Sequence, residues 1–237
     1  MGIDISGNKE ISINESHDHR LVTCPSKNPK ISKVNGLKIS SIYRRTKTGD
    51  FARDGNPFIY ALKQKSGYSI SKHELAKFSP SLYATLEKVL ENQSADVVVP
   101  MPSSHNIATI LARRVARNCG GELITDFMLK QTVGSALEQF DLSMVHPKHK
   151  KEVKAQLATY RKLAPHAQIS LKKVPNKIRQ YFSPVIINSN YNDLGREGTV
   201  ILVDDLLSTG TTLSAARKLV VEYGGHCDIA VCLLSDL

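Results

Sequence analysis

The chain has 237 residues and a formal net charge of +10, from 32 Lys+Arg against 22 Asp+Glu. Hydrophobic residues at 41% and charged residues at 23% exclude a disordered or fibrous protein, and this length suits one or two domains with a substantial core. No stretch approaches the roughly 18 apolar residues of a membrane span, and residues 1–20 lack the apolar run of a signal peptide. The four cysteines lie far apart without a CxxC pair. We therefore expect a cytoplasmic protein with reduced thiols and no membrane partner.

The positive charge is concentrated in one segment, residues 146–180. This segment carries ten Lys or Arg residues and one acid, Glu152, so its net charge is +9, and the other 202 residues sum to +1. The chain is therefore a nearly neutral protein with one basic segment. Such a segment suits an acidic partner, such as nucleic acid or a phosphorylated ligand.

The first third of the chain shows weak periodicity. Residues 1–30 are polar without a sustained period, which predicts a flexible N-terminal arm. Residues 37–44 alternate as a strand does, and residues 58–62 are predicted to return as a second strand. Between residues 72 and 92 the apolar side chains recur at helical spacing, with Ser71 as the expected cap.

The rest of the chain repeats one order of elements twice. Strand, polar turn, helix and strand are predicted at 96–99, 100–104, up to about 118, and 123–129, and again at 199–203, 208–212, up to about 223, and 228–234. A further short strand is predicted at 185–187. Continuous Val, Ile and Leu runs are typical of strands buried on both faces of a parallel sheet. These patterns predict an α/β fold with a doubly wound parallel sheet, whose ligand site lies at the carboxyl ends of its strands.

The segment 200–212 carries the most chemical information. Four apolar residues end at Asp204 and Asp205, and a hydroxyl-rich turn with Gly210 then opens a helix. Amides and hydroxyls at a helix start can surround a phosphate, and Gly210 allows the backbone to approach it closely. Adjacent carboxylates suit ribose hydroxyls or water bound to Mg²⁺. Phosphate and diol recognition side by side predict a sugar phosphate as the ligand.

This segment resembles the ribose-phosphate signature of type I phosphoribosyltransferases (PRTases), which use phosphoribosyl pyrophosphate (PRPP). Residues 96–104 (DVVVPMPSS) are similar to the strand and pyrophosphate loop of the ComF-like, competence-associated branch of that family, and residues 58–65 are loosely similar to it. The resemblance covers about 95–237. It implies a PRTase core at 95–237 with a basic insertion at 138–183, an N-terminal hood at 31–94 and the flexible arm at 1–30.

The resemblance also implies the reaction and its residues. The enzyme would transfer ribose 5-phosphate from PRPP to a small nitrogenous acceptor with release of pyrophosphate, and Mg²⁺ would be held near Asp204 and Asp205 through ligand and water. Lys130 is the expected basic residue on the departing pyrophosphate. A homo-oligomer is compatible with this assignment. The residues expected to bind PRPP are Asp204, Asp205, Leu206, Leu207, Ser208, Thr209, Gly210, Thr211, Thr212, Met101, Ser103 and Ser104.

The sequence departs from the family pattern at three places. Cys24 stands alone where many ComF-like chains have a cysteine cluster, which predicts no zinc. The turn after Pro102 lacks the longer Arg-rich loop, and the region after Lys130 does not match the family's mobile catalytic loop, although residues 176–182 are faintly similar to its end. An alternative function is therefore a PRPP- or nucleotide-binding regulator, or a nucleic-acid-associated effector, with little or no transferase activity.

Three interpretations of the basic segment follow. A helix is expected to begin at Pro147, with Val153, Leu157 and Tyr160 on one side. Its lysines form a solvated face, or bind nucleic acid through phosphates with Tyr160 and Tyr181 as stacking residues, or lie on an insertion that folds over the active site and contacts pyrophosphate.

Overall fold

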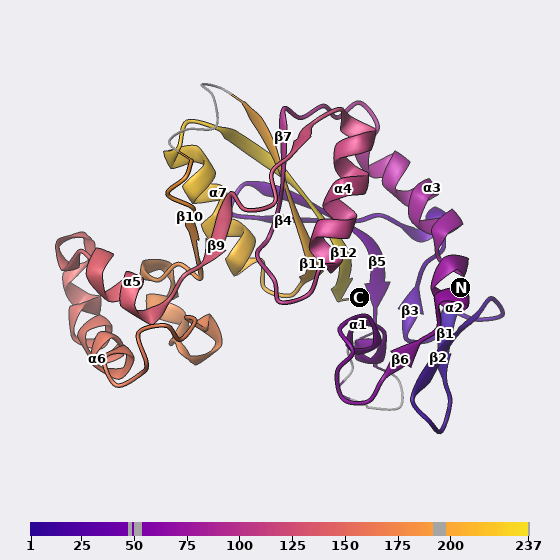
Figure 1. Cartoon of the computed structure of the whole chain (residues 1–237), viewed down its shortest axis with the longest axis horizontal. Helices are drawn as coiled ribbons and strands as arrows, with labels where there is room; N and C mark the ends of the chain where they lie inside the picture. Colours follow the sequence, from indigo (N-terminus) through magenta and orange to yellow (C-terminus); the bar gives the residue numbers. More distant parts are fainter. Residues whose placement is uncertain (47–48, 50–53, 192–197, 237) are drawn as a thin grey trace.

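A mixed, mostly parallel seven-stranded sheet organises the fold (Figure 1). The computed structural model describes residues 1–46, 49, 54–191 and 198–236. The strand order is β3-β5-β12-β11-β7-β8, and β4 pairs with β5 on the same edge as β3, opposite β12. Strands β5, β12, β11, β7 and β8 run parallel to their neighbours, and β3 and β4 run antiparallel to β5. The bounds are β3 (Leu21–Val22), β4 (Lys30–Val34), β5 (Leu37–Arg45), β7 (Val97–Pro100), β8 (Glu122–Leu123), β11 (Thr199–Leu207) and β12 (His226–Asp236).

Helices cover both faces of this sheet, which confirms the predicted α/β class. Helices α3 (Ser79–Leu90) and α4 (Ile107–Cys119) pack with Ile201 and Val203 on one face. Helix α7 (Thr211–Glu222) packs with Val200 and Leu202 on the other. All four of these β11 side chains are fully buried, because the strand lies between two apolar layers. The continuous apolar run in the sequence reflects this double burial.

Residues 58–62, predicted as a strand, form a helix instead. Helix α1 spans Asn56–Leu62, with Pro57 in its first turn and Phe58 and Ile59 buried against the sheet. A short apolar run alone does not distinguish a buried strand from a buried helix.

The predicted helix over 72–92 is two helices, α2 (Lys72–Lys77) and α3 (Ser79–Leu90). Pro80 lies in the first turn of α3, where its missing N–H costs nothing. The cap prediction is confirmed, because Ser71 Oγ accepts a hydrogen bond from the Glu74 amide at 3.1 Å.

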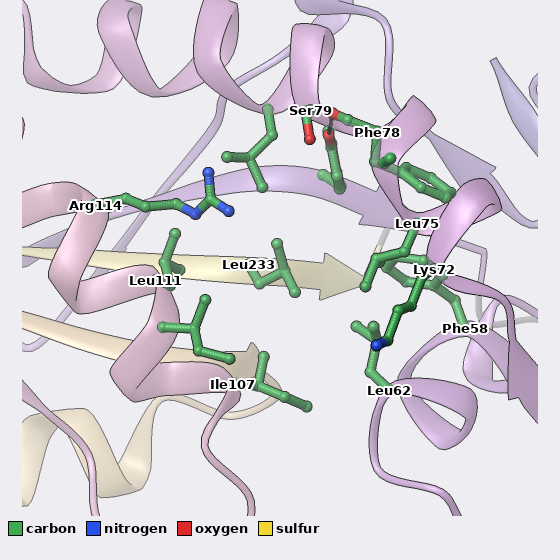
Figure 2. A pocket seen from close by; sticks show the side chains of 14 residues that line it. Phe58, Leu62, Lys72, Leu75, Phe78, Ser79, Ile107, Leu111, Arg114 and Leu233 are labelled. Carbon is green, nitrogen blue, oxygen red and sulfur yellow. Dashed lines mark hydrogen bonds between the residues drawn. The ribbon is translucent and has the colours of Figure 1, made fainter.

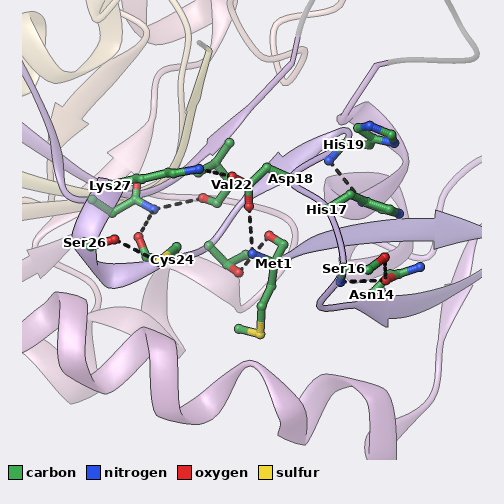
Figure 3. Close-up of polar contacts among 12 residues, drawn as sticks. Met1, Asn14, Ser16, His17, Asp18, His19, Val22, Cys24, Ser26 and Lys27 are labelled. Carbon is green, nitrogen blue, oxygen red and sulfur yellow. Dashed lines mark hydrogen bonds and ion pairs between the residues drawn. The ribbon is translucent and has the colours of Figure 1, made fainter.

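Residues 1–30 are structured, contrary to the predicted flexible arm. Strands β1 (Gly2–Ile5) and β2 (Glu10–Asn14) form an antiparallel hairpin, β2 also pairs with β6 (Ser69–Ile70), and a short 3₁₀ helix spans Pro25–Lys27. Figure 3 shows the polar contacts beside this hairpin, where the Met1 amine and Lys27 both pair with Asp18. Lys27 and then the amine lower the pKa of Asp18 to about 2. Each strand of the hairpin has only two alternating isoleucines, Ile3 and Ile5 in β1 and Ile11 and Ile13 in β2. These are too few to produce a sustained period in the sequence.

A helical lobe is inserted between two antiparallel strands, β9 (Met128–Lys130) and β10 (Val185–Ile187). This inserted lobe, residues 131–183, lies beside the sheet in Figure 1 and begins earlier than the insertion predicted at 138–183. Buried residues of the lobe form an apolar cluster of its own, which includes Val153, Leu157 and Tyr160. Its elements are α5 (Val133–Gln139), α6 (Lys150–Tyr160) and 3₁₀ turns at Leu142–Met144, Pro147–His149, Leu171–Lys173 and Asn176–Tyr181.

Most lysines of the lobe are exposed, whereas the two tyrosines considered for stacking on bases are not. Lysines 148, 150, 151, 154, 162, 173 and 177 are exposed. Tyr160 is 3% exposed, so it is not available as the stacking residue that the nucleic-acid interpretation invoked. The Tyr181 hydroxyl is 2.9 Å from His149 Nδ1. Among the described residues, no helix is long and apolar enough to cross a bilayer.

The packed N-terminus makes a direct prediction for stability. Ile11→Ala should lower the free energy of unfolding by about 2–4 kcal/mol, because it removes a side chain that is 0% exposed. Ile31→Ala is the matched control, since Ile31 is 56% exposed and its loss should change little. Urea unfolding measures both variants. Equal stability of the two would show that residues 1–30 behave as the flexible arm.

Candidate functional site

Strand register brings the two predicted loops to the same edge of the sheet. Val203 in β11 pairs with Pro100 in β7, and the Met101 amide donates to the Val203 carbonyl at 2.7 Å. The turn 101–106 thus begins beside Asp204, the next residue of β11. Residues far apart in the sequence meet here because parallel strands present their carboxyl ends at one edge.

The two predicted carboxylates occupy different environments. Asp205 is 5% exposed, and its amide donates to Asp204 Oδ1 at 2.8 Å. Asp204 is partly buried. Burial, and then the negative charge of Asp205, raise the pKa of Asp204 to about 7. One carboxylate of the pair can therefore change its charge near neutral pH.

Lys63 compensates the charge of Asp205, and sequence analysis did not single it out. Its Nζ lies 2.6 Å from Asp205 Oδ2, and both side chains are largely buried. Lys63 directly follows α1, so this helix fixes where the ammonium group lies. The available signal was its position in residues 58–65, a segment noted only as loosely similar to the ComF-like branch.

The hydroxyl-rich turn is shorter than predicted. Leu206 and Leu207 belong to β11, where they pair in register with Leu234 and Ser235 of β12. The turn itself comprises residues 208–210, with Ser208 and Thr209 exposed and Thr209 Oγ1 2.8 Å from Thr211 Oγ1. Leu206 and Leu207, expected to bind PRPP, are therefore strand residues. Thr211 and Thr212, predicted within the turn over 208–212, lie in the first turn of α7.

Gly210 is required by this turn for two physical reasons. Its φ of +71° is one that residues with a side chain rarely adopt, and it caps the N-terminus of α7. A Cβ atom at this position would also lie 3.0 Å from the Val34 side chain. The turn is thus held against the β4–β5 hairpin.

The other residues predicted to belong to the site differ in their exposure and in their position in the fold. Ser103 and Ser104 are exposed, and Ser103 Oγ accepts from the His105 amide at 3.3 Å. Met101 is 3% exposed, so only its backbone faces the edge of the sheet. Lys130 lies opposite Val185 at the base of the inserted lobe. Among the described residues, no ion pair joins Lys130 to Asp204 or Asp205.

A separate apolar cavity of about 330 Å³ lies between α4 and the α1–α3 region (Figure 2). Phe58, Leu62, Ile107 and Leu233 are among its lining residues, and none of the predicted binding residues lines it. No group of three His, Cys, Asp or Glu side chains in the described parts of the chain could hold a metal ion. A metal at the Asp204–Asp205 edge would therefore need ligand or water oxygens as well.

Comparison with known proteins gives distant structural matches. No protein-family model and no curated protein sequence matches the chain. The adenine phosphoribosyltransferase of Thermoanaerobacter pseudethanolicus is 15% identical with a TM-score of 0.34, and the match covers 89% of this chain and 96% of that one. The adenine phosphoribosyltransferase of Leishmania tarentolae is 12% identical with a TM-score of 0.34, covering 99% and 94%. These similarities are too distant to assign a function, which is argued below from the residues themselves.

The Asp205–Lys63 pair predicts strong coupling between the two residues. Lys63→Met should lower the free energy of unfolding by about 3 kcal/mol, because it leaves a buried carboxylate without its cation. Asp205→Asn in the same chain should restore most of that loss, as urea unfolding of the double-mutant cycle would show. Lys218→Met is the control, since its pair with Glu222 at 3.6 Å is exposed. Additive effects of the two substitutions would contradict the pairing.

The raised pKa of Asp204 predicts a pH-dependent stability difference. The folded chain keeps a proton on Asp204 up to about pH 7, whereas the unfolded chain loses it near pH 4. The stabilisation from this group is therefore full at low pH and is lost as the pH rises to 7. Asp204→Asn should gain stability over the parent by about 1 kcal/mol per pH unit across that window, measured by urea unfolding. A pH-independent difference would contradict the assignment.

Proposed function

We propose that this chain is a phosphoribosyltransferase that binds PRPP and Mg²⁺ and transfers ribose 5-phosphate to a nitrogenous acceptor with release of pyrophosphate. One observation carries the proposal: a carboxylate pair lies near the carboxyl end of a buried strand, two residues before a hydroxyl-rich turn and a helix N-terminus. The turn and helix offer amide and hydroxyl donors to a phosphate. The carboxylates offer acceptors to two ribose hydroxyls. Only a ligand with both groups a few ångströms apart uses both features.

Each described residue has a task in this proposal. Asp204 and Asp205 accept hydrogen bonds from the ribose hydroxyls, and Lys63, 2.6 Å from Asp205 Oδ2, fixes the position of that carboxylate. Ser208, Thr209 and the start of α7 bind the 5′-phosphate. Ser103 and Ser104, exposed in the turn after β7, are positioned to donate to pyrophosphate. These preorganised donors stabilise the charge that develops on the leaving group as the bond at ribose C1 breaks.

Mg²⁺ suits this donor set. Carboxylate oxygens are ligands that Mg²⁺ prefers, and it usually keeps several waters and shares phosphate oxygens of its substrate. Asp204, with a pKa near 7 and no cation paired to it among the described residues, is the better candidate to hold it than Asp205, which already pairs with Lys63. The ion would neutralise charge on the pyrophosphate.

The inserted lobe favours a second function, a PRPP-binding regulator with little transferase activity. The family resemblance implies a mobile catalytic loop after Lys130, whereas this chain carries a folded lobe with its own apolar cluster there. Lys130, the expected cation for pyrophosphate, lies at the base of that lobe. Both functions require PRPP binding, and turnover distinguishes them.

Binding of PRPP with Mg²⁺, measured by calorimetry, tests the proposal. Asp204→Asn and Asp205→Asn should each weaken PRPP binding at least about tenfold, because a charge-assisted hydrogen bond to the ribose becomes a neutral one. Asp228→Asn is the matched control, since Asp228 is exposed and pairs with Arg217 at the other end of β12. The proposal fails if the parent chain does not bind PRPP or if the site variants equal the control.

Release of pyrophosphate from PRPP, assayed across a panel of nitrogenous bases, then separates the two functions. We expect turnover with at least one acceptor that is lost in the Asp205→Asn chain. Tight PRPP binding without turnover on any acceptor would favour the regulator.

A further inference from the structure

The inserted lobe faces the hydroxyl-rich turn across a cavity of about 590 Å³. Asn176 and residues 179–183 line it from the lobe, and Val34 and Asn35 of the β4–β5 turn line a second side. The third side is one face of α7 and the turn before it, including Thr209 and Thr211. The lobe and the candidate phosphate turn therefore share one solvent-filled space.

Positive charge gathers at this cavity without an equal number of acids. Arg179 lines it from the lobe and Lys218 from α7, and the positive end of the α7 dipole opens at Thr211. The acidic side chain of the lining is Glu222, which lies eleven residues beyond Thr211 in the helix, or about 16 Å along its axis. Glu222 is also 3.6 Å from Lys218. Glu222 therefore offsets Lys218, and the remaining positive groups of the lining are Arg179 and the N-terminus of α7, beside the hydroxyls of Thr209 and Thr211.

Arg179 is held in a fixed orientation at this cavity. Its Nε donates to the Val174 carbonyl at 2.7 Å, and the side chain is partly buried. Anchoring through Nε fixes the plane of the guanidinium group. The guanidinium and the N-terminus of α7 line one cavity and both attract anions, so a phosphate dianion between them would interact favourably with both.

We propose that the inserted lobe binds the 5′-phosphate end of the ligand together with the 208–211 turn, with Arg179 as the binding residue. This inference rests on the proposed function and deepens it, because it gives the basic insertion a part in the same site. The turn 101–106 does not line the cavity, so Arg179 serves the ribose 5-phosphate end and not the pyrophosphate end. The ligand thereby joins the lobe to the sheet.

Calorimetry with three probes on the full chain tests this assignment. Arg179→Ala should weaken binding of ribose 5-phosphate and of PRPP by about tenfold to a hundredfold, and leave binding of pyrophosphate unchanged. Arg161→Ala is the control, since Arg161 is an exposed arginine of the same lobe just after α6 and does not line the cavity. Arg179→Lys should recover part of the affinity, because it keeps the charge and loses the fork of donors.

Hydrogen exchange on the parent chain adds a readout that does not depend on a variant folding. Ribose 5-phosphate should slow exchange of amides in residues 176–183, and inorganic pyrophosphate should not. The inference is overturned if Arg179→Ala equals Arg161→Ala, if it weakens pyrophosphate binding equally, or if the parent chain does not bind ribose 5-phosphate. Binding of ribose 5-phosphate through Arg179 without binding of PRPP would reject the proposed function and leave this inference standing.

Discussion

The ion pair between Asp205 and Lys63 is the interaction on which the arrangement of the site depends. A carboxylate that is 5% exposed at the end of a buried strand is costly unless a cation accompanies it. Lys63 supplies that cation from the end of α1, so the N-terminal region is needed to complete a site whose carboxylates and hydroxyl-rich turn lie in the last third of the chain. Burial, and then the negative charge of Asp205, raise the pKa of the neighbouring Asp204 to about 7.

The arrangement of the loops at this edge of the sheet also depends on strand register. The parallel pairing of β11 with β7 places the turn 101–106 beside the carboxylates, and the pairing of β11 with β12 extends through Leu207 before the chain turns at Gly210. Val34 packs where a Cβ of residue 210 would lie, so the β4–β5 hairpin supports the turn from outside. The residues proposed to bind phosphate and ribose thereby lie on the sheet and at the start of α7. The inserted lobe has a separate apolar cluster and faces the 208–210 turn across the neighbouring cavity.

Periodicity predicted the core of the fold well and its surroundings poorly. Strands β5, β7, β11 and β12 and helices α4, α6 and α7 were predicted within a few residues, because each carries a sustained apolar pattern. The strand predicted at 123–129 is instead two short strands, β8 and β9. Residues 58–62 became a helix, and residues 1–30 became strands, because four or five residues are too few to define a period. The pairing of Lys63 with Asp205 joins residues 142 positions apart, so no local pattern could reveal it. Tyr160 was expected to be available for stacking and is instead part of the lobe's own cluster.

The net charge of +10 illustrates which properties the sequence determined and which the tertiary structure decided. The sequence by itself determined that the excess lies in residues 146–180, outside the Asp-Asp motif, and that the motif ends a buried strand before a turn rich in hydroxyl groups. Only the tertiary structure decided that most of those lysines point to solvent while Arg179 faces the cavity beside Thr209 and Thr211. The reason is physical: composition fixes how many charges a segment carries, but folding of the lobe around its apolar cluster decides which of them turn toward the sheet.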